Sequence, residues 1–149
     1  MIERIQVAKP SAAYVAASWS ALSVGVFSFL LGLWNAELVL NEKGYYLTLL
    51  LFGLYSAVSI QKAVRDKAEG IPITSLYLNI TWFAVMSSLT LLAVGLWNAE
   101  MTLSEKGFYG IAFFMSMFAA LVVQKNIRDS VAVEASEVGS GVSFKRSAD

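Results

Sequence analysis

The sequence predicts an all-α membrane protein whose four transmembrane helices form two tandem helical hairpins, repeated in parallel. Of its 149 residues, 57% are hydrophobic and only 15% are charged, whereas about a quarter of the residues in a soluble domain are charged. The charges are clustered and leave four long segments without any: 10–36, 44–61, 70–99 and 107–124. The chain also repeats itself at an offset of 63 residues, so that 14–66 aligns with 77–129. Both copies keep one orientation, because each copy crosses the membrane twice.

Each uncharged segment is long enough to cross a bilayer, since a transmembrane helix needs roughly 20 mainly apolar residues. Ser11 and Thr74 are candidate N-caps for the first helix of each hairpin, because a hydroxyl accepts hydrogen bonds from the free N–H groups at a helix start. Asn41 and Ser104 are the candidate N-caps for the second helices. We therefore expect helices at about 12–34, 42–65, 75–97 and 105–128.

Polar segments delimit the two repeats. The first unit covers 1–66, including the N-terminal tail, and the second covers 75–129. Between them, Gly70 interrupts the helical pattern and predicts a cytoplasmic linker over 67–74. The final segment, 130–149, consists mostly of small and polar residues, and we expect it to be disordered.

Lysine and arginine residues are distributed unevenly and predict the orientation of the chain. Only Lys43 and Lys106 lie near the hairpin tips, and the other nine of the 11 lie in the N-terminal tail, around the linker and after the last apolar segment. Cytoplasmic loops of membrane proteins carry an excess of Lys and Arg. We therefore expect a multi-pass protein of the bacterial inner membrane with both termini in the cytoplasm.

Small residues at four-residue spacing predict the faces on which the helices pack, because small side chains let two backbones approach closely inside a membrane. On the first helix these residues are Ala13, Ala17, Ala21 and Gly25. The second helices carry Gly53 with Ala57, and Ser116 with Ala120.

The residue types that are missing exclude several classes of function. The chain has no Cys and no His, so it cannot form a disulfide, a thiolate or imidazole metal site, or a Ser–His catalytic pair. Its net charge is zero and its basic residues form no stripe, which argues against a nucleic-acid partner. No Asp, Glu, Lys, Arg or His lies within the four apolar segments, which argues against an ion-coupled pump. We expect no metal, no cofactor and no enzymatic activity.

Two tip motifs mark the hairpin turns: GLWNAELVLNEKGYY from Gly32 and GLWNAEMTLSEKGFY from Gly95. Their aromatic side chains are expected at the membrane interface, and Glu42 and Glu105 in a first helical turn, where the helix dipole favours an acid. The Asn-x-Glu pairs have no evident local role; they are Asn35, Glu37, Asn98 and Glu100. One interpretation is a symmetric periplasmic site for a cation or a partner, and the other is a well-specified turn.

A second repeated motif, QKAVRD and QKNIRD, ends each hairpin on the cytoplasmic side. Its charged residues are Lys62, Arg65, Asp66, Lys125, Arg128 and Asp129. The cations suit a helix C-terminus and the anionic headgroups of the cytoplasmic leaflet. We also expect each arginine to pair with the aspartate of the other repeat. Lipid anchoring with fastening of the two hairpins is one interpretation of the motif, and a surface for docking a partner is the other.

The duplicated tip motifs and QK-x-x-RD motifs resemble those of the YiaA/YiaB inner-membrane family, whose unit is the YiaA/B two-helix domain. The resemblance covers roughly residues 11–129. It implies a bacterial inner-membrane protein with two such units and carries no catalytic assignment.

Two functions fit these features. The first is a non-enzymatic scaffold or accessory component of a membrane assembly, in contact with the lipid bilayer and with another membrane protein or a second copy of the chain. The second is a carrier of small solutes or lipids, with its path between the two hairpins. The carrier hypothesis predicts a membrane-depth cavity lined by Ser56, Ser59, Asn79, Ser87 and Ser88.

Overall fold

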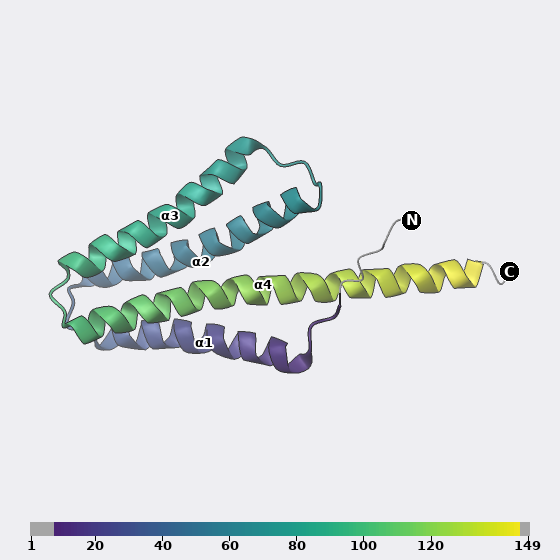
Figure 1. Cartoon of the computed structure of the whole chain (residues 1–149). Coiled ribbons are helices and arrows are strands. Elements are labelled where there is room, and N and C mark those ends of the chain that lie inside the picture. The colour runs from purple at the N-terminus through teal and green to yellow at the C-terminus, as the bar shows by residue number, and fades with distance from the viewer. Residues whose placement is uncertain (1–7, 147–149) are drawn as a thin grey trace.

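Four helices make up the described part of the chain in the computed structural model, which describes residues 8–146 and their side chains through Val138 (Figure 1). The helices are α1 (Ala12–Asn35), α2 (Leu40–Ala68), α3 (Ser75–Asn98) and α4 (Leu103–Arg146). All four are long and apolar enough to cross a membrane. The predicted all-α class with two tandem hairpins is therefore confirmed.

The helices α1 and α3 begin where the sequence predicts. The Ser11 hydroxyl accepts a hydrogen bond from the Tyr14 N–H at 3.2 Å, and the Thr74 hydroxyl accepts one from the Tyr77 N–H at the same distance. Each hydroxyl thereby satisfies one of the N–H groups that a helix start leaves without a partner.

The helices α2 and α4 begin two residues before the predicted positions, because glutamates cap them. Val39 N–H donates to Glu42 Oε2 at 3.1 Å, and Thr102 N–H donates to Glu105 Oε2 at 2.7 Å. These contacts are one arm of a capping box, in which the acid at the third helical position folds back onto the cap. The candidate caps Asn41 and Ser104 were therefore wrong, and both residues lie inside helices.

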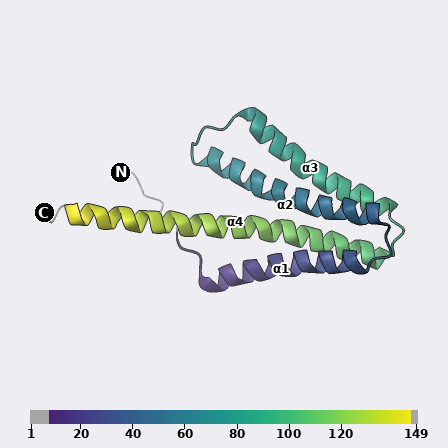
Figure 2. The same cartoon turned by 180° about the vertical axis from the view of Figure 1, so that it is seen from behind.

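The helices pack in the order α1, α4, α2, α3, which Figures 1 and 2 display from opposite sides. Helix α1 packs along α4 and α2 packs along α3, while α2 and α4 meet in the middle. The two helices of one hairpin touch only slightly. The repeats thus exchange helices: the first helix of each hairpin packs on the second helix of the other.

This exchange predicts how the protein behaves when it is cut between the repeats. We expect fragments 1–71 and 72–149 to co-purify when they are expressed together, because α1–α4 and α2–α3 are the extensive interfaces. Expressed alone, each fragment should fail to give a stable monomer. Co-purification in mild detergent, followed by size-exclusion chromatography, measures this outcome, and two independently stable monomeric hairpins would contradict the exchange.

The buried face of α1 differs from the ridge of small residues that the sequence indicates. Its buried residues are Ser18, Gly25, Phe29 and Leu33. Ala13 and Ala17 are exposed, so only the Gly25 end of the predicted ridge packs against another helix. The other predicted packing residues, Gly53, Ala57, Ser116 and Ala120, are buried as expected.

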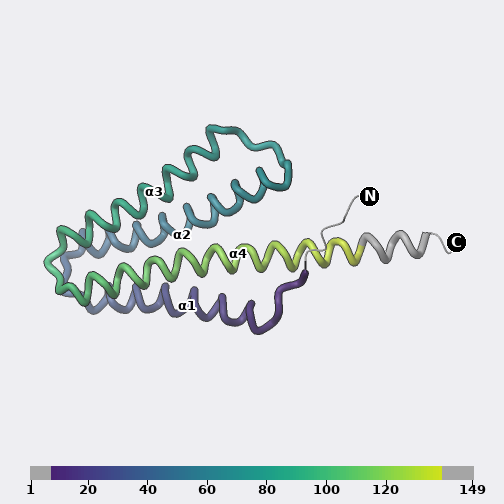
Figure 3. The backbone as a smooth tube through the Cα atoms, in the orientation of Figure 1, coloured from purple at the N-terminus to yellow at the C-terminus, as the bar shows by residue number. Residues whose placement is uncertain are grey.

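Helix α4 continues far past the end of the second repeat (Figure 3). The disordered tail expected from Ser130 is instead helical to Arg146, and the last residues of that tail, 147–149, lie outside the described residues. No proline follows Asp129 to stop the helix, and Val, Ala and Glu extend its pattern. The linker is also shorter than predicted, because α2 runs to Ala68. Gly70, with a φ of 74°, turns the chain just after α2 ends.

Candidate functional site

An ion-pair cluster joins the end of α2 to the middle of α4, away from the hairpin tips. Arg65 Nη2 lies 2.7 Å from Asp129 Oδ1, and Arg128 Nη2 lies 2.8 Å from Asp66 Oδ1. Each arginine therefore pairs with the aspartate of the other repeat, which confirms the expected cross-pairing. The two aspartate side chains are only 7% and 6% exposed, so these pairs are well shielded from water.

Lysines complete the partner set of both buried aspartates. Lys62 Nζ lies 2.6 Å from Asp66 Oδ2, and Lys125 Nζ lies 2.8 Å from Asp129 Oδ2. The lysine side chains themselves are more than half exposed. Each aspartate thus receives one cation from its own helix and one from the other repeat, and the lysines extend to the surface of the cluster.

Glu69 is a seventh member of this cluster that the sequence reasoning missed. Its Oε1 lies 2.8 Å from Arg65 Nε, and its Oε2 lies 2.9 Å from Arg128 Nη2. The hydrogen bond from Arg65 lowers the pKa of Glu69 below its ordinary value. The i,i+4 spacing from Arg65 was the available signal. Ala132 occupies the equivalent position in the second repeat, so this bridge exists on one side only.

At the other end, the predicted Asn-x-Glu residues divide into two kinds. The Asn35 and Asn98 side chains each donate from Nδ2 to the carbonyl four residues earlier, at 2.8 Å, and so stabilise the ends of α1 and α3. Glu37 and Glu100 are exposed, and within the described part of the chain neither forms a hydrogen bond or ion pair. A joint cation site formed by these two carboxylates stays a prediction.

The lysines of the tip motifs have a structural role at the turns. Lys43 Nζ donates to the Trp34 carbonyl at 3.0 Å, and Lys106 Nζ donates to the Trp97 carbonyl at 3.3 Å. A cation at a helix C-terminus satisfies a free carbonyl and suits the helix dipole. The indole rings of both tryptophans point outward and are highly exposed, as expected for an interfacial aromatic belt.

Aromatic residues of each tip motif pack on the glycine of the other motif. A Cβ on Gly32 would lie 2.6 Å from a ring carbon of Phe108, and a Cβ on Gly95 would lie 2.7 Å from a ring carbon of Tyr45. The glycines therefore make room for rings that arrive from the other repeat. Behind these rings, the buried residues Tyr46 and Tyr109 stack with their centroids 6.1 Å apart.

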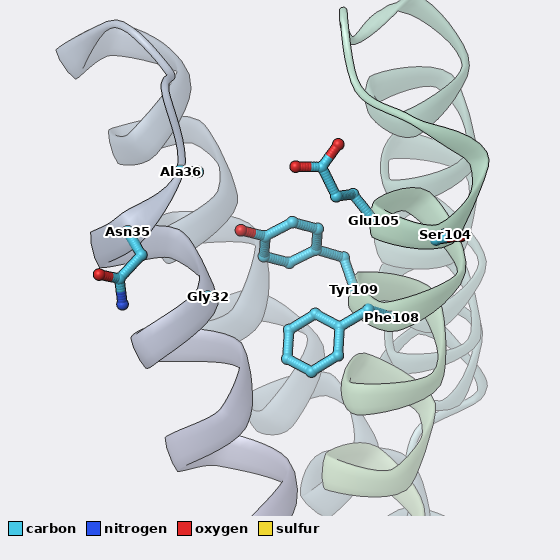
Figure 4. Close-up of a pocket in the computed structure, with 7 residues that line it drawn as sticks. All are labelled: Gly32, Asn35, Ala36, Ser104, Glu105, Phe108 and Tyr109. Atoms are coloured by element: carbon cyan, nitrogen blue, oxygen red, sulfur yellow. The ribbon is translucent and has the colours of Figure 1, made fainter.

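The exchange also creates two equivalent pockets, the twin tip pockets, at the end of the molecule where the hairpins turn. The first lies between the end of α1 and the start of α4, with Glu105, Phe108 and Tyr109 facing Gly32 and Ala36 (Figure 4). Its volume is about 310 Å³.

The second pocket, of about 260 Å³, lies between the end of α3 and the start of α2. Its lining residues are the repeat equivalents of the first: Glu42, Tyr45, Tyr46, Gly95 and Ala99. Asn35 and Asn98 lie at the edges of these pockets, whereas Glu37 and Glu100 line neither.

The polar residues expected to line a carrier path do not share one surface. Ser56 and Ser88 are fully buried and donate to carbonyls of their own helices, Gly53 and Val85. Asn79, by contrast, is exposed on the outside of α3. Within the described residues, no group of three or more acidic, His or Cys side chains is placed to hold a metal ion.

Comparison with known proteins places these motifs in a family. Residues 14–66 and again 77–129 match the model of the yiaA/B two helix domain. The inner membrane protein YiaA of Escherichia coli (strain K12) is 59% identical over 120 residues, which cover 80% of this chain and 83% of that protein. The inner membrane protein YiaB of the same organism is 29% identical over 101 residues, 66% of this chain and 83% of that protein. No solved structure matches the chain.

Proposed function

This chain belongs to the family of the yiaA/B two helix domain, and on that premise we propose that it is a non-enzymatic scaffold of the inner membrane. In this proposal, the four-helix layer holds the cytoplasmic end of α4 in a fixed position. This end of α4 then binds another component of a membrane assembly.

The length of α4 is the observation that carries the proposal. Its 44 residues correspond to about 66 Å of helix, at 1.5 Å per residue, while the hydrocarbon core is only about 30 Å thick. Val131 and Val138 lie on the extension, are 59% and 69% exposed, and are seven residues apart. Apolar residues at heptad spacing lie on one face of a helix and favour docking of a second helix.

The ion-pair cluster supports this role, because it fixes α4 just before the extension begins. Arg65 and Arg128 hold α2 and α4 together, so that the extension leaves the membrane from a braced position. The exposed Lys62 and Lys125 are suited to anionic headgroups. Together with the excess of Lys and Arg on this side, they favour an orientation with both termini in the cytoplasm.

A single cysteine on the extension tests this proposal, since the natural chain has none. Val138→Cys is labelled with a membrane-impermeant maleimide that carries a photoreactive group, and the membranes are then illuminated. In inverted vesicles we expect a discrete cross-linked adduct, whose mass identifies either a different protein or a second copy of the chain. Leu40→Cys, at the exposed opposite end, is the matched control and should give no such adduct.

The absence of any adduct from Val138→Cys in inverted vesicles would contradict the scaffold. Labelling of the same cysteine in intact spheroplasts would contradict the orientation instead. Mass spectrometry of the adduct and labelling from the two sides of the membrane therefore separate the two parts of the proposal.

A further inference from the structure

We propose that the twin tip pockets each bind a primary ammonium group, of the kind carried by an ethanolamine headgroup or by a free alkylamine. The proposal concerns the end of the molecule opposite the α4 extension and does not depend on the scaffold role. It starts from the polar atoms that face the pockets without a partner.

The tyrosine hydroxyls at the base of the pockets are the first such atoms. Tyr109 is 4% exposed and Tyr46 is 3% exposed, and neither hydroxyl forms a hydrogen bond with any residue that the structure describes. The Tyr109 hydroxyl lies beside Gly32, because a Cβ built there would be 3.2 Å away (Figure 4). Neither hydroxyl is among the fully buried polar atoms without a partner, so both open onto the pockets and can bond to a ligand there.

A carboxylate faces each pocket and sets the charge of the ligand. Glu105 uses Oε2 to accept from the N–H and the hydroxyl of Thr102, at 2.7 and 2.8 Å. Its other oxygen has no partner among the described residues and can accept a further hydrogen bond. Glu42 is placed in the same way, with Oε2 bonded to the Val39 N–H at 3.1 Å.

The remaining surroundings also favour a cation. Each pocket lies against the C-terminal turn of α1 or α3, whose dipole attracts cations and whose Trp34 or Trp97 carbonyl already holds Lys43 or Lys106. The faces of Phe108 and Tyr109 attract cations through their π electrons. The described lining of each pocket contains no lysine or arginine, and it contains one carboxylate.

The acceptors select a primary ammonium group over a quaternary one. An ammonium group with three N–H donors can bond to the carboxylate, to the tyrosine oxygen and to a helix carbonyl together. A choline group has no N–H donor and would leave those acceptors without partners. The exposed Trp34 and Trp97 mark the membrane interface at this end, so lipid headgroups lie at the depth of the pockets.

Native mass spectrometry of the full-length protein in mild detergent tests the proposal by counting bound lipids. With phosphatidylethanolamine we expect two lipids per chain, and with phosphatidylcholine none. Tyr109→Phe keeps the ring and removes one hydroxyl, and Glu105→Gln keeps the helix cap, since Gln also serves in a capping box. Each substitution should weaken binding in one pocket by about tenfold, because it removes a hydrogen bond to a charged group.

The double variant Glu42→Gln, Glu105→Gln should lose both lipids, whereas the control Glu37→Gln, Glu100→Gln should keep both. Free ethanolamine, added to protein that already carries phosphatidylethanolamine, distinguishes the two sources of the ammonium group. Displacement of phosphatidylethanolamine by millimolar ethanolamine would identify a free amine as the preferred ligand, and its failure to compete would identify the lipid. Equal binding of both lipids, or unchanged binding by the double variant, would overturn the proposal.

Discussion

Replacing Asp129 with Ala is expected to lower the free energy of unfolding by about 3 kcal/mol, because removal of one partner from a buried ion pair leaves the opposite charge uncompensated. Asp129 is the partner of both Arg65 and Lys125, and its side chain is only 6% exposed. The loss should lie at the lower end of the range for such pairs, since Arg65 keeps its bond to Glu69. Unfolding in detergent with increasing SDS, followed by circular dichroism, measures the effect.

Glu69→Ala is the matched control for this prediction. Glu69 contacts both arginines, but its side chain is 43% exposed. Ion pairs with such exposure contribute at most about 1 kcal/mol, because water screens them. We therefore expect a small loss for Glu69→Ala and a loss several times larger for Asp129→Ala. Equal losses would show that the buried aspartates do not fasten the repeats.

The cross-paired cluster could be predicted from sequence because charged residues are rare in this chain and recur at equivalent positions. Two copies in one orientation are related by a pseudo-twofold axis, so the end of each repeat faces its equivalent. Arg65 and Asp129 then have few other partners. Glu69 was missed because it belongs to the linker and has no counterpart in the second repeat.

The exchange of helices could not be predicted in this way. In a membrane, the face of a helix that meets lipid is as apolar as the face that meets protein. Phe29 is fully buried and Phe27, two residues earlier, is 63% exposed, yet both are phenylalanines. The hydrophobic pattern therefore predicts that a helix spans the membrane and does not indicate which helix packs on it.

The twin tip pockets could not be predicted from the sequence for the same reason, because they depend on which helices pack together. Glu105 has a local reason to be where it is, since it caps α4. Its position opposite Gly32 and Ala36 arises only because α1 packs on α4 and not on α2. In the sequence, the Asn-x-Glu residues are the part of the motif without a local role. In the structure, Glu105 lines the first pocket and Glu37 does not.

Gly25→Ala is expected to lower the free energy of unfolding by about 2 kcal/mol, because it forces apart the closely packed α1 and α4. A Cβ at this position would lie 2.6 Å from Ser116 Oγ, 3.0 Å from the Ser116 backbone nitrogen and 3.3 Å from the Ala112 carbonyl oxygen. The hydroxyl can rotate away, but the two backbone atoms move only if the helices separate. The same SDS titration measures the loss.

Gly44→Ala is the matched control, since a Cβ there meets nothing within 4 Å and the residue also lies inside a helix. Alanine favours a helix over glycine by up to about 1 kcal/mol, so this substitution should stabilise the protein. Ser116→Gly should restore only part of the stability lost in Gly25→Ala, because it removes the hydroxyl and leaves the backbone contacts. A loss of stability for Gly25→Ala together with a gain for Gly44→Ala would show that glycine is required where α1 contacts α4. Equal gains in the free energy of unfolding would mean that α1 does not approach α4 this closely.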